Sequence, residues 1–330
     1  MTTAWFFPGQ GTQTVGMGKE LYASSAAARE VWERADAALG FSLKNLCFEG
    51  PEAELTLTKN AQPAIVTTSI AALAAIREAV PGLSLPAFAA GHSLGEYSAL
   101  VAAGALKFED AVRLVHLRGQ AMQEAVPAGL GGMAAIMGGD AAAVAALCEE
   151  AAQGEVVAPA NFNAPGQIVI SGHKTAVERA AALAGERKLK AILLNVSAPF
   201  HCSLMAPAAA RMKQALAQVS PGPMGFPVLP NVEAKPNQDS ARVAQLLVQQ
   251  VDSPVQWEQT VRAMADAGVT SALEIGPGKV LAGLAKRIDK RVAVLSVGDS
   301  ESVAKVSDFL GGGSGPASIP GPPSSKLATN

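Results

Sequence analysis

The spacing of apolar residues alternates along the chain between the short runs of buried strands and the three- and four-residue repeat of helices. Residues 4–7 form a short apolar run that Pro8 and Gly9 stop, so we predict a buried strand leading into a glycine-rich loop. Apolar residues at helical spacing follow over 20–39 and 61–79. This alternation of strands and helices predicts an α/β fold built on a parallel sheet.

A second strand is predicted at 85–90, and it runs directly into Gly91-His92-Ser93-Leu94-Gly95. The pattern then predicts a helix over 96–103, which Gly104 can end. A further helix is predicted over 108–125. The motif 91–95 therefore lies between a strand and a helix.

The order of elements changes to strand, helix, strand, strand, helix, strand in the middle of the chain. The segments are 132–137, 140–153, 156–161, 167–171, 174–185 and 191–196. That order is the split βαβ arrangement, so we expect a ferredoxin-like small domain over 127–197, inserted into a larger α/β-hydrolase-like domain. The larger domain would then comprise residues 1–126 and 198–310.

The alternation of helices and strands resumes after Cys202, with strands predicted at 226–229, 271–275 and 292–297. Residues 311–330 are rich in Gly, Pro and Ser and have no apolar period. We expect this end to be a flexible tail without a catalytic role.

Composition narrows the class of protein. Lysine and arginine total 26 against 28 acidic residues, so no global basic field favours nucleic acid or an anionic membrane. The 3 cysteines are too few for a disulfide framework or a closed zinc site. No targeting segment or membrane span is evident. We therefore expect a cytoplasmic, globular and monomeric enzyme that needs no metal.

The five-residue motif Gly-x-Ser-x-Gly at 91–95 has the pattern of a nucleophile elbow, and its place between strand and helix strengthens that interpretation. Small flanking residues permit a sharp turn that exposes the Ser93 hydroxyl. The amide of Leu94 would then point towards an anion at the helix N-terminus. The competing interpretation is a chance match in a loop.

A serine hydroxyl needs a base to take its proton, and histidine is the usual one. His201 lies between a predicted strand and a helix, where the larger domain resumes, so we predict that it is the base. His116 falls within a helix, and His173 follows a glycine at a strand end. For His92, inside the elbow, a structural hydrogen bond is the favoured interpretation.

The group that orients the histidine is less evident. Asp110 and Asp140 are the aspartates between Ser93 and His201, and neither lies at a convincing strand end. A carbonyl or amide oxygen could serve instead, and Gln250 is a candidate that spacing alone does not identify.

Arg118 lies on the helix predicted over 108–125. On base rates it would be a surface helix arginine. Its guanidinium could also bind a carboxylate through two hydrogen bonds, as a malonyl group would require and an acetyl group would not.

Taken together, these motifs resemble the malonyl-CoA:acyl carrier protein transacylases of fatty acid synthesis and the acyltransferase domains of polyketide synthases. The likeness covers roughly residues 1–300. It depends on Pro8-Gly9-Gln10-Gly11, Gly91-His92-Ser93-Leu94-Gly95-Glu96, Arg118 in Arg-Gly-x-x-Met, Asn161, Pro199-Phe200-His201, and Gln250 with Pro254-Val255-Gln256-Trp257.

The resemblance implies a role for each matching residue. Ser93 would be the nucleophile, His201 the general base and acid, and Gln250 the residue that orients the histidine. The backbone amides of Gln10 and Leu94 would form the oxyanion hole. Further roles are implied for four residues that would bind or surround the acyl group: Arg118, which would hold the malonyl carboxylate, Asn161 and Ser197, which would line the pocket, and Phe200, which is typical of malonyl-accepting members.

The implied reaction is a ping-pong transfer from malonyl-CoA to the phosphopantetheine thiol of acyl carrier protein, without a cofactor. Two other functions stay open: a serine hydrolase or thioesterase, and a non-enzymatic docking module. The carrier protein could serve fatty acid or polyketide synthesis. Because carrier proteins are acidic, a basic patch is expected to meet them; its candidate residues are Lys188, Lys190, Lys279, Lys286 and Arg287.

Overall fold

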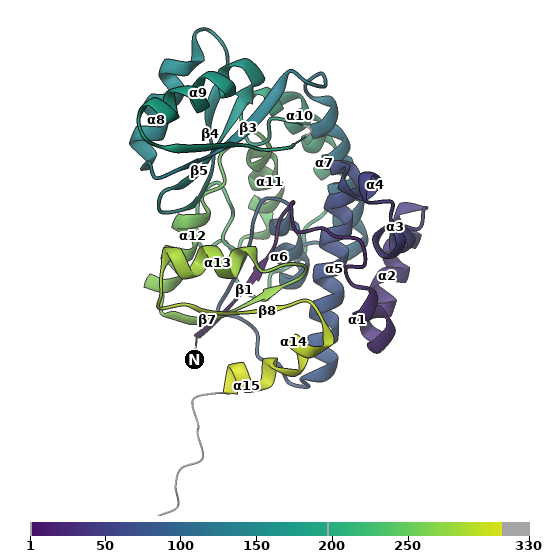
Figure 1. Ribbon diagram of the computed structural model, residues 1–330. Coiled ribbons are helices and arrows are strands. Elements are labelled where there is room, and N and C mark those ends of the chain that lie inside the picture. The colour runs from purple at the N-terminus through teal and green to yellow at the C-terminus, as the bar shows by residue number, and fades with distance from the viewer. Residues whose placement is uncertain (1, 197, 312–330) are drawn as a thin grey trace, which may run out of the picture.

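The computed structural model describes residues 2–196 and 198–311, which form a larger α/β unit beneath a smaller one (Figure 1). The larger unit is built on a sheet with the strand order β2-β1-β7-β8, in which every neighbouring pair is parallel. Its strands are β1 (Thr2–Phe7), β2 (Phe88–Gly91), β7 (Val269–Ile275) and β8 (Ala293–Val297). The predicted α/β class with a parallel sheet is confirmed.

The side chains of the central strand β1 alternate between two apolar clusters, as the period of a strand requires. Trp5 and Phe7 pack into the cluster on one face of the sheet, whereas Ala4 and Phe6 pack into the cluster on the other. The exposure of all four side chains is 0–1%. A parallel sheet buried on both faces explains why residues 4–7 are continuously apolar.

Helices cover both faces of this sheet. They are α1 (Lys19–Ser24), α2 (Ala26–Leu39), α3 (Leu43–Glu49), α4 (Glu52–Thr56), α5 (Thr58–Ala79), α6 (Gly95–Ala103), α7 (Phe108–Glu124), α10 (Ala206–Leu216), α11 (Val243–Asp252), α12 (Trp257–Asp266), α13 (Val280–Ile288), α14 (Ser300–Ala304) and α15 (Val306–Gly311). Short 3₁₀ turns are present at Ser203–Met205 and Ser240–Arg242.

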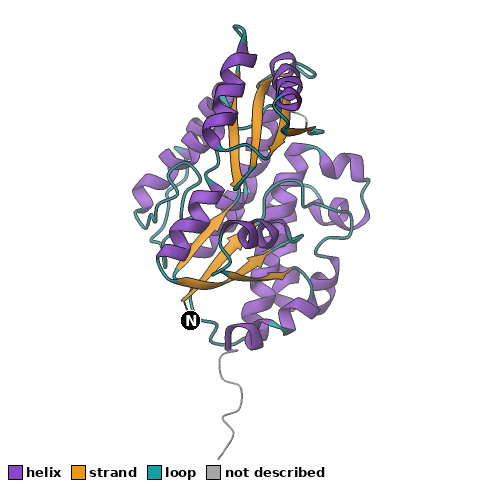
Figure 2. Cartoon of the chain, turned by 60° about the vertical axis from the view of Figure 1, so that its left-hand side comes forward, coloured by secondary structure: helices purple, strands orange, loops and turns teal. Residues whose placement is uncertain are grey.

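The smaller unit is an antiparallel sheet with the strand order β4-β5-β3-β6, and two helices pack on it (Figure 2). Its elements are β3 (Gly131–Met137), α8 (Ala141–Ala152), β4 (Val157–Ala164), β5 (Gln167–His173), α9 (Lys174–Glu186) and β6 (Lys190–Leu193). The two helices share an apolar cluster with one face of the sheet. The order of strands and helices agrees with the sequence prediction.

Several predicted elements differ from the structure. The strand predicted at 85–90 begins at Phe88, and the strand predicted at 156–161 continues to Ala164. The helix predicted over 20–39 is two helices, because Ser25 takes an extended conformation and its hydroxyl accepts a hydrogen bond from the Ala28 amide at 3.0 Å. The strand predicted at 226–229 is absent; Val228 makes only isolated bridges, and Pro227 and Pro230 beside it lack the amide that a ladder needs. The last strand of the smaller sheet ends at Leu193 rather than at 196.

Backbone hydrogen bonds join the two units. The Val255 amide donates to the Ala160 carbonyl at 2.9 Å, and the Phe162 amide donates to the Val255 carbonyl at 2.9 Å. The segment after α11 is thereby paired with β4. Over 2–196 and 198–311, no helix combines the length and apolar character that a membrane crossing requires. Most of the tail predicted for 311–330 lies outside the described residues.

Candidate active site

Ser93 lies at a tight turn between β2 and α6, with a positive φ of 51°. Glycines on either side make this turn possible. A Cβ at Gly91 would lie 1.9 Å from the carbonyl carbon of Gly95, and a Cβ at Gly95 would lie 2.2 Å from the carbonyl oxygen of Phe7. The geometry is that of a nucleophile elbow, in which a non-glycine residue holds a sparsely populated conformation.

The Ser93 hydroxyl contacts His201, which lies on the loop before α10. Ser93 Oγ is 2.8 Å from His201 Nε2, and His201 Nδ1 is 2.9 Å from the backbone carbonyl oxygen of Gln250. A carbonyl can only accept, so Nδ1 carries the proton and Nε2 is left to accept from the serine. Serine, imidazole and carbonyl thus form a continuous hydrogen-bonded chain. The carbonyl orients the ring, and the serine proton can pass to Nε2.

The environment of His201 favours the neutral imidazole that a base requires. Burial of the ring, reinforced by the nearby Arg118 charge, lowers the pKa of His201 from 6.5 to about 3. The imidazole is therefore uncharged near neutral pH and free to accept a proton at Nε2.

Arg118 is buried on α7 with 1% exposure, so the interpretation as a surface helix arginine is wrong. Its Nη2 donates to Ser93 Oγ at 3.1 Å and to Gln250 Oε1 at 2.9 Å, and its Nη1 donates to Gln62 Oε1 at 2.9 Å. Its Nε has no hydrogen-bond partner. No ion pair to Arg118 is present among the described residues.

A buried cation without a paired carboxylate is costly unless something compensates its charge. Burial accordingly lowers the pKa of Arg118. Glu96 lies near enough for attraction, but burial raises the pKa of that carboxyl to about 7, so it compensates poorly at neutral pH. The arginine beside the serine is therefore suited to bind an anionic group that enters from outside.

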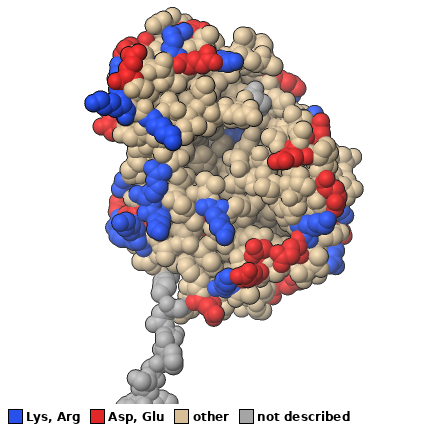
Figure 3. Space-filling model, viewed as in Figure 1, with Lys and Arg blue, Asp and Glu red and all other residues tan. Residues whose placement is uncertain are grey.

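A cavity of about 550 Å³ opens at Ser93 between the two units, where Figure 3 shows the surface hollowed. Its lining comes from both units and includes Gln10, Gln62, Ser93, Arg118, Met122, Met133, Asn161, Asn163, Phe200 and His201. The structure thus brings together around one cavity the predicted residues Gln10, Asn161 and Phe200 with Ser93, Arg118 and His201. Ser197 lies outside the described residues.

The backbone amides of Gln10 and Leu94 have no acceptor among the described residues. The Gln10 side chain instead donates to the Thr58 hydroxyl at 3.3 Å. Pairing of Phe7 with Gly91 brings the loop after β1 to the same sheet edge as the elbow. These two amides are therefore available to an oxygen atom near Ser93.

The remaining histidines have other hydrogen bonds. His92 Nε2 lies 2.8 Å from Asn163 Oδ1, which links the elbow to β4. His116 Nδ1 lies 2.8 Å from the Lys59 carbonyl, and His173 Nδ1 accepts from the Val156 amide at 2.9 Å. None of the three contacts Ser93 Oγ. Among the described histidines, only His201 does.

The sequence prediction missed three buried residues of this site. Gln62 accepts a hydrogen bond from Arg118, and Asn231 accepts one from the Ser93 amide. The Glu96 carboxyl accepts hydrogen bonds from the Asn231 amide and from Gln250. Glu96 directly follows the elbow motif, which is a usable signal. Gln62 and Asn231 are far from Ser93 in sequence and carry no recognisable pattern.

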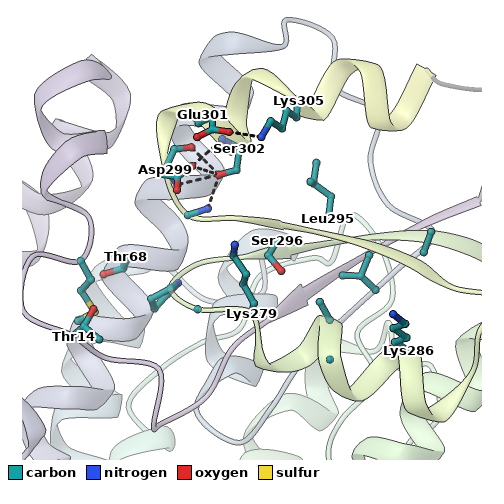
Figure 4. A pocket seen from close by; sticks show the side chains of 18 of the residues that line it. Thr14, Thr68, Lys279, Lys286, Leu295, Ser296, Asp299, Glu301, Ser302 and Lys305 are labelled. Carbon is teal, nitrogen blue, oxygen red and sulfur yellow. Dashed lines mark hydrogen bonds and ion pairs between the residues drawn. The ribbon is translucent and has the colours of Figure 1, made fainter.

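A second cavity, of about 950 Å³, lies along β8 between α13 and α14 (Figure 4). Its lining includes Lys279, Lys286, Lys290 and Lys305. Lys305 is paired with Glu301 at 2.5 Å. Ser93 and His201 do not line it, so it is separate from the cavity at Ser93.

Comparison with known proteins relates the chain to acyl-transferring enzymes. Residues 4–304 match the family model described as acyl transferase domain. The malonyl CoA-acyl carrier protein transacylase of Bacillus subtilis is 49% identical over 302 residues, covering 91% of this chain and 94% of the relative. The enzyme of the same name from Escherichia coli K12 is 48% identical, and the match covers 91% of this chain and 97% of the relative.

Solved structures agree with that relation. An acyl carrier protein S-malonyltransferase from Vibrio cholerae superimposes with a TM-score of 0.90 at 45% identity, covering 93% of this chain and 100% of the other. A malonyl-transacylase in complex with a type II polyketide acyl carrier protein superimposes with a TM-score of 0.90 at 42% identity. The match covers 94% of this chain and 100% of the other.

Proposed function

This chain belongs to the acyl transferase domain family, among the relatives of the malonyl CoA-acyl carrier protein transacylases, and on that premise we propose that it carries a malonyl group from coenzyme A to acyl carrier protein. The chain is thus an acyltransferase. The proposal rests above all on the 3.1 Å contact between Arg118 and the Ser93 hydroxyl. Arg118 is buried and forms no ion pair with any described residue. A malonyl carboxylate is the anion that this pair is placed to receive.

In the first half-reaction, Ser93 Oγ attacks the thioester carbonyl carbon of malonyl-CoA while its proton passes to His201 Nε2. The amides of Gln10 and Leu94 stabilise the oxyanion that forms. The carbon–sulfur bond then breaks, and His201 returns the proton to the departing coenzyme A thiolate. The product is a malonyl ester of Ser93.

In the second half-reaction, the phosphopantetheine thiol of the carrier protein attacks that ester. His201 takes the thiol proton, and the tetrahedral oxyanion again lies against the two amides. When the carbon–oxygen bond breaks, the proton moves from His201 to Ser93 Oγ. The serine is restored and the malonyl group is a thioester once more, so the exchange is ping-pong and needs no cofactor.

The residues around the cavity supply selectivity. Arg118 binds the malonyl carboxylate, while Asn161 and Phe200 bound the space beside the reacting carbonyl. Gln250 supports the base through the contact of its backbone carbonyl with His201. The resemblance gives Ser197 a place in the same pocket.

Two other functions share this site. A serine hydrolase or thioesterase would use the same pair but pass the acyl group to water. A discrete polyketide acyltransferase would use the same chemistry on another carrier protein, and the related complex with a polyketide carrier supports that possibility. The buried arginine favours a malonyl group over an uncharged acyl group, and the relation to transacylases favours transfer over hydrolysis.

We also infer the finer class of each unit and the setting of the enzyme. The parallel sheet with its elbow supports a hydrolase-like larger domain, and the order β4-β5-β3-β6 supports a ferredoxin-like smaller one. The cysteines Cys47, Cys148 and Cys202 are buried free thiols, as a reducing cytoplasm permits. The enzyme would act as a monomer and meet its acidic carrier through basic residues such as Lys286.

Mass spectrometry after mixing with malonyl-CoA tests this function. We expect one malonyl mass on the peptide that contains Ser93, and its loss when carrier protein with a free phosphopantetheine thiol is added. The Ser93→Ala variant, as control, should gain no mass. A protein that acquires no ester, or that releases malonate to water as fast as to carrier protein, would contradict the proposal.

A further inference from the structure

Asn231 lies on the loop between α10 and α11, and its side-chain amide bridges two backbone groups of the nucleophile elbow, those of Gly91 and Ser93. Its Oδ1 accepts a hydrogen bond from the Ser93 amide at 2.7 Å. Its Nδ2 donates to the Gly91 carbonyl at 2.7 Å. One partner can only donate and the other can only accept, so the orientation of the amide group is fixed.

The backbone of Asn231 is held equally firmly. Its amide donates to Glu96 Oε2 at 2.9 Å, and its carbonyl accepts from the Gln256 amide at 2.9 Å. The residue is 1% exposed. Every polar group of Asn231 therefore has a partner, and two of these partners belong to the elbow.

The same network extends to the residue that holds the base. Gln250 Nε2 donates to Glu96 Oε2 at 2.8 Å and to the Ser93 carbonyl at 2.9 Å, while the Gln250 backbone carbonyl faces His201. Glu96 thus receives hydrogen bonds from both Asn231 and Gln250. Displacement of Asn231 would therefore move Ser93 directly, and it would move His201 through Glu96 and Gln250.

We propose that Asn231 is a positioning residue that holds Ser93 in its reactive conformation and reserves the Leu94 amide for the oxyanion. Ser93 has a positive φ, which a non-glycine residue keeps only when its surroundings impose it. Asn231 imposes it by binding the amide of Ser93 and the carbonyl two residues earlier. Because the Ser93 amide is occupied, Leu94 supplies the free amide of the elbow.

Asn231 does not line the cavity, so it acts through Ser93 rather than on substrate. A positioning role therefore predicts a loss in the rate of serine attack without a comparable change in substrate binding. The inference rests on the proposed role of Ser93 as nucleophile, and the experiment is chosen to separate the two.

The test measures labelling of Ser93 by a fluorophosphonate, in which Oγ bonds to phosphorus, fluoride leaves, and His201 takes the hydroxyl proton. This reaction requires the activated serine but not malonyl recognition. The Asn231→Ala variant removes both elbow bonds. The Asn231→Asp variant keeps the shape and the acceptor but places an oxygen against the Gly91 carbonyl, so it tests the bridge without opening a cavity.

A matched control is Asn237→Ala. Asn237 is also a buried asparagine, with 5% exposure on the same loop, but its side chain donates to the Asp239 carbonyl at 3.1 Å, away from the elbow. Thermal unfolding is measured for all variants. The Kd for malonyl-CoA is measured for each substitution in a Ser93→Ala background, in which no ester can form. We expect both Asn231 variants to label about 10- to 100-fold more slowly, with Kd changed less than about threefold.

The control should label at the rate of the parent protein. Labelling of both folded Asn231 variants within about threefold of the parent, or an equal loss in the Asn237 variant, would overturn the proposal. So would a parent protein that is not labelled at Ser93. A parent that reacts with the fluorophosphonate but forms no malonyl ester would contradict the proposed function alone, and the variants would still decide the role of Asn231.

Discussion

The amide oxygen of Gln62 on α5 accepts a hydrogen bond at 2.9 Å from Nη1 of Arg118 on α7, and both side chains reach the cavity at Ser93. This contact fixes one end of the guanidinium, while Gln250 fixes Nη2. The fork that would receive a carboxylate is therefore set before any substrate arrives, which reduces the entropy lost on binding.

Replacement of Gln62 by Leu should weaken malonyl binding. The apolar side chain keeps the volume but leaves Nη1 without its acceptor, so the guanidinium can rotate away. We expect KM for malonyl-CoA to rise about tenfold, with acetyl transfer changed much less. Steady-state rates with both thioesters measure this. Equal losses for the two substrates would show that Gln62 does not act through Arg118.

Replacement of Arg118 by Ala should abolish the preference for malonyl-CoA while keeping some acetyl transfer. The buried charge that would pair with the malonyl carboxylate is lost, whereas Ser93 and His201 remain. We expect kcat/KM for malonyl-CoA to fall by at least about 100-fold. Arg118→Lys is the matched control, because it keeps the charge without the planar fork. Undiminished malonyl turnover in the Ala variant would refute this role for Arg118.

The imidazole of His201 should resist protonation well below pH 6.5. Its pKa is lowered to about 3 by burial and by Arg118, so the folded protein binds fewer protons at this site than the unfolded chain. NMR titration should show a neutral ring down to about pH 5. The associated stability is present above pH 6.5 and is lost as pH falls towards 3. His201→Gln should remove that part of the pH dependence, and a ring that titrates at its ordinary pKa would contradict the geometry.

An alanine at position 95 should disrupt the elbow. Its Cβ would lie 2.2 Å from the Phe7 carbonyl oxygen, so either β1 or α6 must move. We expect a loss of roughly 2–4 kcal/mol in the free energy of unfolding together with loss of serine labelling. Gly283→Ala is the control, because a Cβ there has nothing within 4 Å. Denaturant titrations compare the two variants, and equal stability would contradict the predicted clash.

Charge reversal at Lys286 should weaken the reaction with carrier protein only. Lys286 is exposed on α13 and lies along the second cavity. Arg287 is a poorer choice, because it bonds to Gln167 and to the Pro165 carbonyl, which belong to the smaller unit. For Lys286→Glu we expect KM for carrier protein to rise several-fold, with formation of the malonyl ester unchanged. An unchanged KM would remove Lys286 from the docking surface.

The parts of the site that are local in sequence could be predicted. The elbow follows from Gly91, Ser93 and Gly95, because the turn requires these small residues within five positions. His201 could be proposed because it follows a predicted strand. Ser25 carries a signal for a helix start, since serine is a good helix N-cap. The apolar period over 20–39 continues across it, however, and therefore predicted one helix instead of two.

The parts that depend on tertiary structure could not be predicted. The burial of Arg118 follows from the packing of α7 against α5, and no local pattern distinguishes it from a surface arginine. Asn231 reaches Ser93 from 138 residues away, and His201 is held by the backbone carbonyl of Gln250, which side-chain identity cannot reveal. At 226–229 the apolar run predicted a strand, although Pro227 and Pro230 lack the amides that a strand donates to its neighbour.

The pairing of Val255 with β4 joins the wall of the cavity that holds Asn161 to the segment that follows Gln250. Val255 follows Gln250 by a few residues and is stitched to Ala160 and Phe162 on either side of Asn161. A change in β4 that widened the cavity would also displace Val255, and with it the nearby Gln250 carbonyl that contacts His201. If Asn161 bounds the acyl pocket and His201 is the base, a change in acyl group would alter the rate of turnover as well. A variant that accepts a bulkier acyl group would then need compensating substitutions where Val255 meets β4.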